Sequence, residues 1–203
     1  MKKQFAITTL VLFCAVLVLD SCKKGENDPF LSLRSRKGRM AGEWKGSKGD
    51  GKYVDGSSNT TYTYTWDGTT MNTTITIGSS TFTSSNGHTV SLKIEKDGTY
   101  EIITTETFTN NTVVTTDKGV WNFTGKVGEY KNKDHVVFRT LSSTTTNSNP
   151  SSTSTTTYTG DSAPSEIWYI DMLKNKEMVV KSKGTEVNAS GTESLEMNMT
   201  FVQ

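Results

Sequence analysis

Residues 90–123, VSLKIEKDGTYEIITTETFTNNTVVTTDKGVWNF, predict three consecutive antiparallel strands. The opening segment, VSLKIE, alternates apolar and polar residues, which is the pattern of a strand with one buried face. Turn residues follow at Asp97-Gly98 and at Asn110-Asn111, and Trp121 lies in the last segment. The stretch therefore predicts an antiparallel meander, with two turns that connect three strands.

The first turn can be assigned a type from the positions of the apolar residues. A two-residue loop would place Ile94 opposite Glu101 and mix the apolar and polar faces. A three-residue loop over residues 96–98 places Ile94 opposite Tyr100 and keeps the faces separate. We therefore expect a type I turn with Gly98 in a G1 bulge, because glycine adopts positive φ without strain.

The composition of the whole chain agrees with a β-rich protein. Hydrophobic residues make up 33% of its 203 residues. Thr, Ser, Gly and Asn are abundant, which favours strands and turns over helices. The length suits one domain with appendages. A formal net charge of +1 gives no electrostatic case for binding nucleic acid.

Several other segments have the same alternating pattern. Asp67-Gly68 separates two of them and predicts a hairpin. In another, Trp168, Ile170 and Met172 are expected to share one face of a strand. The alternating segments outside the meander are residues 61–66, 71–77, 136–140, 166–173, 178–180 and 195–201.

Three segments are expected to be loops. Residues 79–87 and 186–191 are polar, and a short strand fits only at residues 81–83. Residues 142–159 consist mostly of Ser and Thr, which bury too little apolar area to offset their ordering entropy. One interpretation of residues 142–159 is a long hairpin with Thr-rich strands and a disordered tip.

The first residues resemble the signal of a bacterial lipoprotein. Two lysines precede an apolar run over residues 5–19, which is shorter than the roughly 20 residues that span a bilayer. The run ends in Leu19-Asp20-Ser21-Cys22, similar to the Leu, small residue and invariant Cys of such signals. The resemblance implies that residues 1–21 are removed. It also implies that lipid on Cys22 anchors the protein to the outer membrane, on its periplasmic or cell-surface side. An ordinary signal peptide or an uncleaved anchor is the alternative.

Residues 22–40 are predicted to form a tether between the lipid and the folded domain. Basic residues predominate in this segment. They indicate one of two roles: the segment is attracted to anionic lipid head groups or acidic glycan, or it is a solvated linker. Phe30, Leu31 and Leu33 suggest that the second half docks on the domain as a short helix or an extended plug. Cys14 lies in the signal segment, so the mature chain cannot form a disulfide.

A family resemblance rests on three short motifs. Gly42-Glu43-Trp44 resembles the Gly-x-Trp in the first strand of lipocalins. Together with the lipoprotein leader, KDGTY at residues 96–100 and GVWNF at residues 119–123, it resembles the lipocalin-like lipoproteins of Bacteroidetes. With the number of alternating segments, the resemblance implies an all-β, antiparallel up-and-down lipocalin-like β-barrel of about 8–10 strands over residues 41–203.

Within this expected barrel, Gly42, Trp44, Gly98 and Trp121 form the structural signature. Trp44 is expected to be a core aromatic residue that closes the barrel floor.

Two candidate sites follow from the residue patterns. Tyr62, Tyr64 and Trp66 alternate with threonines, so their rings share one face. This row suits either a surface on which a ligand or sugar stacks or ordinary cross-strand packing. Asp161-Ser162-Ala163 resembles the O-glycosylation acceptor of exported Bacteroidetes proteins, which makes Ser162 a candidate glycan site.

Motifs for catalysis are absent from the sequence. The chain has two histidines, neither in a metal-ligand spacing, and no phosphate-binding loop, nucleophile elbow or dinucleotide fingerprint. We therefore expect no catalytic residues, no metal, no cofactor and no enzymatic activity.

Two hypotheses about function remain. In the first, the chain is a non-catalytic, membrane-anchored lipoprotein whose barrel binds a small apolar or amphipathic ligand. In the second, it is a cell-surface structural or interaction module that contacts glycan or a partner protein, with a filled barrel and no ligand. The interior of the barrel distinguishes the two, because about eight strands enclose either packed side chains or one small ligand.

Overall fold

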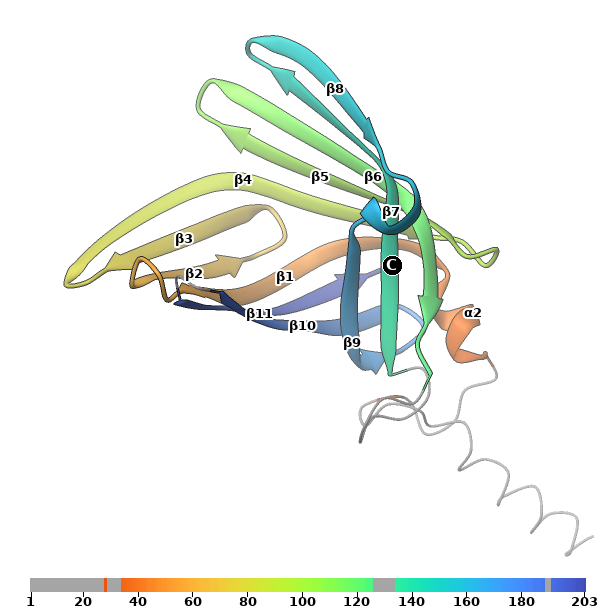
Figure 1. Cartoon of the computed structure of the whole chain (residues 1–203). Coiled ribbons are helices and arrows are strands. Elements are labelled where there is room, and N and C mark those ends of the chain that lie inside the picture. The colour runs from red at the N-terminus through yellow and green to blue at the C-terminus, as the bar shows by residue number, and fades with distance from the viewer. Residues whose placement is uncertain (1–27, 29–33, 126–133, 189–190) are drawn as a thin grey trace, which may run out of the picture.

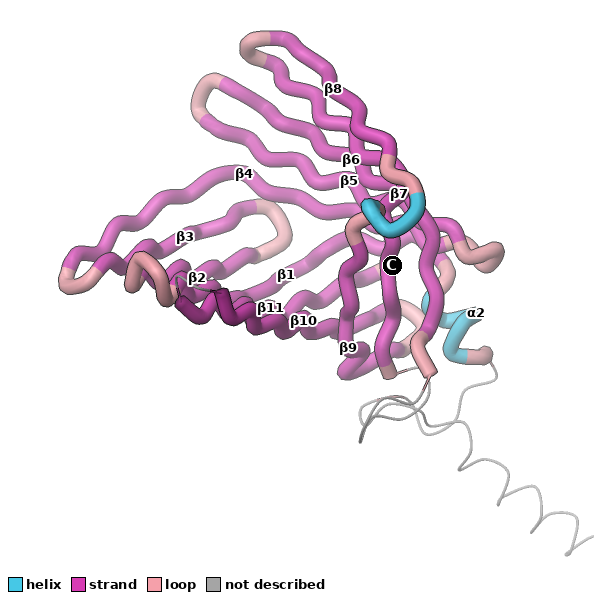
Figure 2. The backbone as a smooth tube through the Cα atoms, viewed as in Figure 1, coloured by secondary structure: helices cyan, strands magenta, loops and turns pink. Residues whose placement is uncertain are grey.

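The computed structural model of the chain describes residues 28, 34–125, 134–188 and 191–203, so the leader, Cys22 and residues 30–33 lie outside the described residues. Within this part, one short α-helix precedes eleven strands. Figure 2 shows that the connections between strands are mostly tight turns. In chain order the elements are α2 (Arg36–Met40), β1 (Gly42–Asp55), β2 (Thr60–Trp66), β3 (Thr70–Ile77), β4 (Ser80–Ile94), β5 (Thr99–Phe108), β6 (Asn111–Phe123), β7 (His135–Ser148), β8 (Ser151–Thr157), the 3-10 turn η2 (Gly160–Ser162), β9 (Ser165–Leu173), β10 (Glu177–Asn188) and β11 (Gly191–Val202).

The strands form one antiparallel sheet that closes on itself. Hydrogen-bonded neighbours follow the order β6-β5-β4-β3-β2-β1-β11-β10-β9-β7-β8, and β6 also pairs with β7. The pairing of β6 with β7 joins the two halves of the sheet into a closed barrel. Closure leaves most backbone groups paired in ladders and removes most of the open sheet edge. The predicted all-β, up-and-down β-barrel is therefore confirmed.

The two ends of the barrel differ in width. At one end β1 pairs directly with β4, from Gly42 opposite Ile94 to Lys45 opposite Ser91. This narrow end is a ring of β1, β4, β5, β6, β7, β9, β10 and β11. Further along, β1 and β4 separate and the β2–β3 hairpin lies between them, which widens the ring. Figure 1 shows the strands converging near α2 and diverging away from it into two wings.

The central meander has the predicted register. Strands β4, β5 and β6 are consecutive neighbours, and Ile94 lies opposite Tyr100. The N–H of Glu95 donates to the carbonyl of Thr99 at 2.9 Å, which closes a three-residue loop. Gly98 has φ +101°, so the predicted glycine with positive φ at this turn is confirmed. The second turn lies at Thr109-Asn110, one residue earlier than predicted, because β6 already begins at Asn111.

The core of the barrel fills the narrow end. Trp44 is 1% exposed and its indole N–H donates to the carbonyl of Met40 at 2.8 Å, so the residue lies at the floor beside α2. Trp121 is also buried, and its N–H donates to the carbonyl of Glu95 at 2.9 Å. These bonds satisfy the polar atom of each large buried ring. The core consists of Met40, Trp44, Leu92, Ile94, Tyr100, Trp121, Val136, Phe138, Trp168, Ile170, Leu173, Met178, Val180 and Phe201.

Two segments predicted as loops are strands. Residues 80–87 form the first half of β4 and pair with β3, and residues 186–188 continue β10 against β11. Residues 80–87 lie in a wing whose side chains are largely exposed. A strand with little buried area needs no alternation of apolar residues, so the pattern gave no signal there.

Strand β7 and strand β8 form the long Ser/Thr-rich hairpin. The ladder continues from Ser142 opposite Thr157 to Ser148 opposite Ser151. The two strands therefore extend up to the Asn149-Pro150 turn, and the disordered tip expected there is wrong. Hydroxyl pairs such as Thr144 with Thr155, at 3.1 Å, add side-chain hydrogen bonds across this exposed ladder.

The predicted faces of β9 are correct only up to Ile170. Trp168 and Ile170 are buried, but Leu173 is buried in place of Met172. The register shifts between Val179 and Val180, which leaves one extra residue on β9. A bulge of this kind reverses the alternation beyond it, so Met172 does not share the inward face.

The end of the basic segment is part of the barrel floor. Helix α2 packs beside β9, and Met40, Arg36 and Arg39 are buried. Ser35 caps the helix by accepting a hydrogen bond from the N–H of Gly38 at 3.0 Å. A docked short helix in this segment is confirmed at residues 36–40, although Phe30, Leu31 and Leu33 lie outside the described residues. The solvated-linker interpretation is wrong for Arg36 and Arg39.

Candidate functional site

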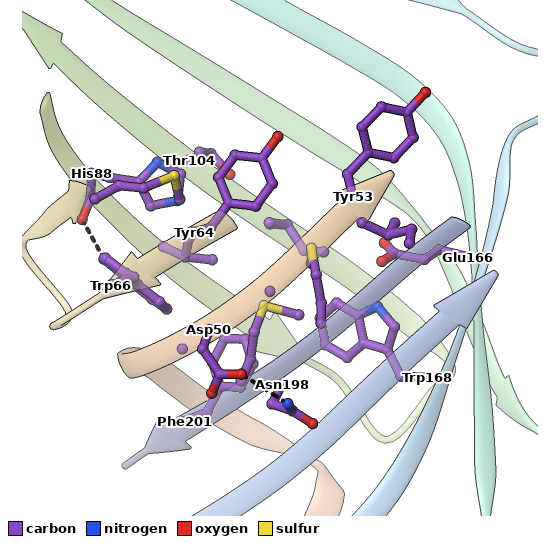
Figure 3. A pocket seen from close by; sticks show the side chains of 18 of the residues that line it. Asp50, Tyr53, Tyr64, Trp66, His88, Thr104, Glu166, Trp168, Asn198 and Phe201 are labelled. Carbon is purple, nitrogen blue, oxygen red and sulfur yellow. Dashed lines mark hydrogen bonds between the residues drawn. The ribbon is translucent and has the colours of Figure 1, made fainter. Parts of the chain in front are cut away.

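A cavity of about 440 Å³ lies above the core, where the narrow end opens between the two wings. Figure 3 shows the side chains around it. Its base is apolar and its walls come from strands on both sides of the mouth. The lining residues are Gly49, Asp50, Gly51, Tyr53, Tyr64, Trp66, Met71, His88, Val90, Ile102, Thr104, Asp117, Glu166, Trp168, Leu195, Met197, Asn198, Met199 and Phe201.

Two glycines on β1 help to create the space. Gly49 lies opposite Trp66 and Gly51 opposite Tyr64 in the β1–β2 ladder. A β-carbon on Gly49 would point toward the ring of Trp66 and the side chain of Met199, so this position faces the interior. Because neither position carries a side chain, the neighbouring aromatic rings and methionines form the wall instead. The sequence therefore leaves a hollow where a regular strand would place side chains.

The aromatic row of β2 lies on the inner face of the wing. Trp66 is 7% exposed, packs over Gly46, and donates its indole N–H to the carbonyl of His88 at 2.8 Å. It is thus a fixed wall of the cavity. Tyr64 also lines the cavity. Tyr62 lies outside the lining and stacks on Tyr64, with ring centroids 6.5 Å apart and planes 8° apart. The structure therefore places two of the three predicted residues in the cavity wall.

A further tyrosine that the sequence did not single out extends this row. Tyr53 on β1 lies opposite Tyr62, with ring centroids 5.7 Å apart. Its hydroxyl donates to Oε2 of Glu193 at 2.8 Å, and this hydrogen bond is the main reason why the pKa of Tyr53 is raised to about 12. The hydroxyl is therefore neutral at physiological pH and holds the ring at the cavity mouth.

The cavity also contains a pair of carboxylates. Glu166 on β9 is two residues before buried Trp168, so it points inward, and Asp117 on β6 is two residues before inward-facing Gly119. The walls of the cavity desolvate the Glu166 carboxyl and raise its pKa, and the negative charge of Asp117 raises it further. Solvent still reaches Glu166 through the open mouth. Alternation with Trp168 was the signal in the sequence that could have revealed Glu166.

Trp168 forms part of the cavity base. The residue is 3% exposed, and its ring packs against Phe138 at 4.7 Å and Phe201 at 5.7 Å between centroids. Its buried indole N–H makes no hydrogen bond of normal geometry within the described residues. Figure 3 shows this N–H on the side of the ring toward Glu166, and its proximity partly opposes the rise in the pKa of that carboxyl. A buried donor without a partner is costly, so its position at the base of a cavity is informative.

His88 lies at the opposite wall. Its ring meets Trp66 edge-on at 5.4 Å, and its Nδ1 is 3.6 Å from Oε1 of Glu106. Burial lowers the pKa of His88, and the negative charge of Glu106 opposes that shift. The imidazole is therefore mainly neutral at physiological pH, since the net direction is downward from a pKa of 6.5.

Ser162 is not among the residues that line this cavity. It ends η2, is exposed, and its hydroxyl donates to the carbonyl of Thr159 at 2.7 Å. The structure neither adds to nor removes the expectation that Ser162 carries a glycan.

Within the described residues, no group of three or more His, Cys, Asp or Glu side chains is arranged to hold a metal ion. The described part also includes no helix with the length and apolar character of a membrane span. Comparisons with protein-family models, with curated proteins and with solved structures found no match to this chain. The cavity geometry is thus the main basis for assigning a function.

Proposed function

We propose that this chain is a non-catalytic binding protein whose barrel takes up a small amphipathic molecule through its open end. The observation that carries the proposal is the cavity of about 440 Å³ above a packed core. Pockets for small ligands usually measure about 300–1,000 Å³ and combine an apolar lining with a few polar groups. An apolar part of a ligand would contact the base, and its polar part would lie toward the mouth.

The lining supports an amphipathic ligand over a purely apolar one. Met197, Met199 and Leu195 from β11 form one apolar wall, and methionines adapt their shape to irregular ligands. Glu166 and Asp117 line the same space. A hydrocarbon would bury these carboxylates without a partner, which is unfavourable.

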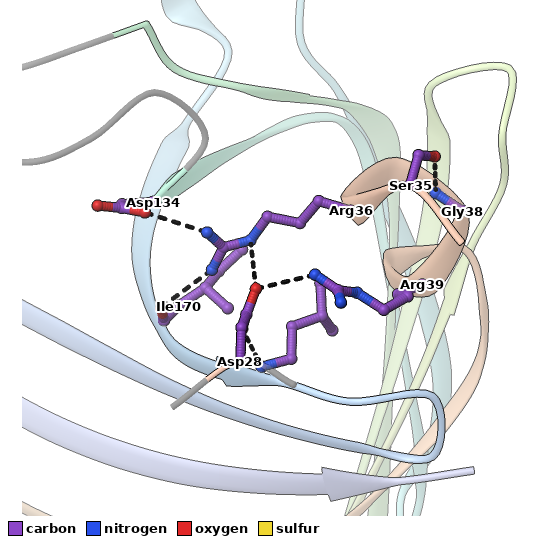
Figure 4. Close-up of polar contacts among 8 residues, drawn as sticks. Asp28, Ser35, Arg36, Gly38, Arg39, Asp134 and Ile170 are labelled. Carbon is purple, nitrogen blue, oxygen red and sulfur yellow. Dashed lines mark hydrogen bonds and ion pairs between the residues drawn. The ribbon is translucent and has the colours of Figure 1, made fainter. Parts of the chain in front are cut away.

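Attachment to the outer membrane through lipid on Cys22 remains part of the proposal, and the contacts of Asp28 support a definite orientation. Figure 4 shows Asp28 beside Arg36 and Arg39 of α2. Its carboxylate accepts hydrogen bonds from Arg39 at 2.8 Å and from the N–H of Leu173 at 2.8 Å. Five residues lie between Cys22 and Asp28, and the six steps along the chain span at most about 20 Å. The narrow end would then face the membrane and the mouth would face away from it. Intact mass of the membrane-extracted protein tests the anchor, because Cys22→Ser should abolish the added acyl mass.

The binding function is tested by native mass spectrometry of residues 23–203, which include every described residue. After exposure to a lipid and metabolite extract, we expect a bound species on this protein. Thr104→Phe should reduce uptake because it places a large ring in the cavity, whereas Thr105→Phe on the opposite face of β5 is the matched control. Absence of any bound species, or equal loss with both variants, would overturn the proposal.

One observation, the exposure of large apolar side chains, favours the interaction-module hypothesis. Large apolar side chains are exposed at the ends of the wings, with Phe82 57%, Ile77 49% and Phe108 48% exposed. Exposed apolar groups of this kind often contact a partner. If the protein binds no small molecule, these residues are the first to substitute in a search for a partner protein.

A further inference from the structure

We propose that the cavity selects amphiphiles that carry a positively charged amine, with the ammonium group beside Glu166 and Asp117. The inference rests on the proposed binding function and specifies its ligand class. It combines three observations: the signs of the charges that face the cavity, the buried N–H at its base that makes no hydrogen bond of normal geometry within the described residues, and the apolar surface below the carboxylates.

The charges that face the cavity have one sign. None of the described residues that line it is Lys or Arg. Glu166 and Asp117 face inward, whereas Asp50 lies between the inward positions Gly49 and Gly51 and accepts a hydrogen bond from Asn198 at 3.0 Å. Asp50 is therefore already partnered on the outer side of the wall. The inner wall is left with two carboxylates that have no cationic partner among the lining residues.

Cations on the surrounding strands are engaged elsewhere. Lys118, next to Asp117, pairs with Glu101 at 2.7 Å on the outer face of the sheet. Lys181 pairs with Asp171 at 3.2 Å, also on the outer face. Arg139, on the neighbouring strand β7, donates to the carbonyl of Gly160. On β6, alternation therefore directs Lys118 outward and Asp117 inward, and the other two cations are held by partners away from the cavity.

The base of the cavity gives further support for an occupant with polar groups. Trp168 is 3% exposed, lines the cavity, and has a buried N–H that makes no hydrogen bond of normal geometry within the described residues, although it lies close enough to Glu166 to act on that carboxyl. Figure 3 places this donor next to the Glu166 carboxylate. A donor and a carboxylate at one point are complementary to a head group that combines an ammonium with an acceptor oxygen or a bound water.

The energetics favour a cation over the other head groups. An anionic amphiphile would add a third negative charge next to two carboxylates in a partly desolvated space. A neutral amphiphile would leave those carboxylates without a counterion. An ammonium would pair with both, and the aromatic ring of Tyr64 in the lining adds a surface that attracts cations.

The test compares three probes with the same decyl chain: decylamine, decanol and decanoate. Each is titrated below its micellar concentration into residues 23–203 at pH 7 by isothermal titration calorimetry. We expect decylamine to bind at least about tenfold more tightly than decanol, and decanoate to bind most weakly. Equal affinity of decylamine and decanol, or a preference for decanoate, would overturn the inference while leaving the binding function intact. If no probe binds, the inference fails, and native mass spectrometry with the extract decides separately whether the binding function fails with it.

A pair of variants identifies the carboxylate. Glu166→Gln should weaken decylamine by about tenfold and leave decanol within about twofold, since it removes charge with little change in shape. Asp171→Asn is the matched control, because it removes one charge from the outer face of the same strand. Circular dichroism before each titration establishes that the variants retain their sheet. A decylamine affinity that changes equally in both variants would show that Glu166 does not contact the ammonium.

Discussion

Replacing Asp28 with Asn should destabilise the barrel strongly, although Asp28 lies outside every strand. The side chains of Asp28, Arg36 and Arg39 are 0%, 2% and 1% exposed, so their charges are compensated almost entirely by one another and by Asp134. Arg36 donates to Oδ1 of Asp134 at 3.0 Å and lies 3.7 Å from Asp28. Burial lowers the pKa of Arg36, and the two aspartates oppose that shift.

The magnitude follows from the cost of a buried charge that loses its partner. Asn at position 28 could still accept a hydrogen bond from the N–H of Leu173, but it could not neutralise Arg39. Removing one member of a buried ion pair typically costs about 3–5 kcal/mol. For a chain of this size, about 2–4 °C in Tm corresponds to 1 kcal/mol, so we expect Tm to fall by roughly 6–20 °C.

Urea and thermal unfolding, followed by tryptophan fluorescence, measure this effect. The control is Asp171→Asn, which breaks a pair that is 22% and 47% exposed and should cost less than about 1 kcal/mol. The double variant Asp28→Asn, Arg39→Gln should recover part of the loss, because it removes the uncompensated cation as well. If Asp28→Asn costs no more than the control, the N-terminal segment does not stabilise the floor and the docking argument is wrong.

Two further predictions concern the central turn and the cavity carboxylate. Gly98→Ala should lower the free energy of unfolding, measured in urea, by about 1–2 kcal/mol, because alanine is strained at the positive φ of this position. Gly184→Ala is the control and should be tolerated better, because a β-carbon at position 184 would meet no atom within 4 Å. Glu166→Gln should raise the stability of the ligand-free protein near pH 7 by less than about 1 kcal/mol, since solvent partly screens this carboxyl. The titratable groups that face Glu166 are Asp117 and Tyr100. Because the pKa of the Glu166 carboxyl is raised in the folded state, the folded protein binds this proton more tightly than the unfolded chain does. The folded protein therefore loses stability as pH rises from the unfolded pKa through the folded one. The gain from Glu166→Gln should thus vanish in melts below about pH 4 and grow toward neutrality; a gain that is constant with pH would contradict this assignment.

The parts of the fold that could be predicted from the sequence are those fixed by local patterns. The register of β4 and β5 followed from the need to place Ile94 and Tyr100 on one face, and Gly98 followed from the same loop. Where a strand buries little area, as in residues 80–87, the pattern is absent although the ladder still forms. The bulge in β9 was equally invisible, because it depends on how β10 pairs with that strand.

The cavity carboxylates could not be predicted as a pair. Glu166 and Asp117 come from β9 and β6, which are not neighbours in the sheet, since β7 lies between them. Their approach depends on the curvature of the barrel, and alternation along one strand contains no information about curvature. The aromatic row of β2 was easier to find, since Tyr64 and Trp66 lie on one strand.

The two hypotheses from the sequence treated a filled barrel and a binding barrel as exclusive, but the structure combines them along one axis. At the narrow end, where β1 pairs with β4, large side chains such as Trp44 and Phe201 fill the interior. The insertion of β2 and β3 widens the ring, and a wider ring encloses more volume than the same side chains can fill. The inward glycines of β1 lie at this widening. Packing that specifies the fold and space that can hold a ligand therefore come from different segments of the same strands. Substitutions such as Thr104→Phe can for this reason remove the cavity without disturbing the floor.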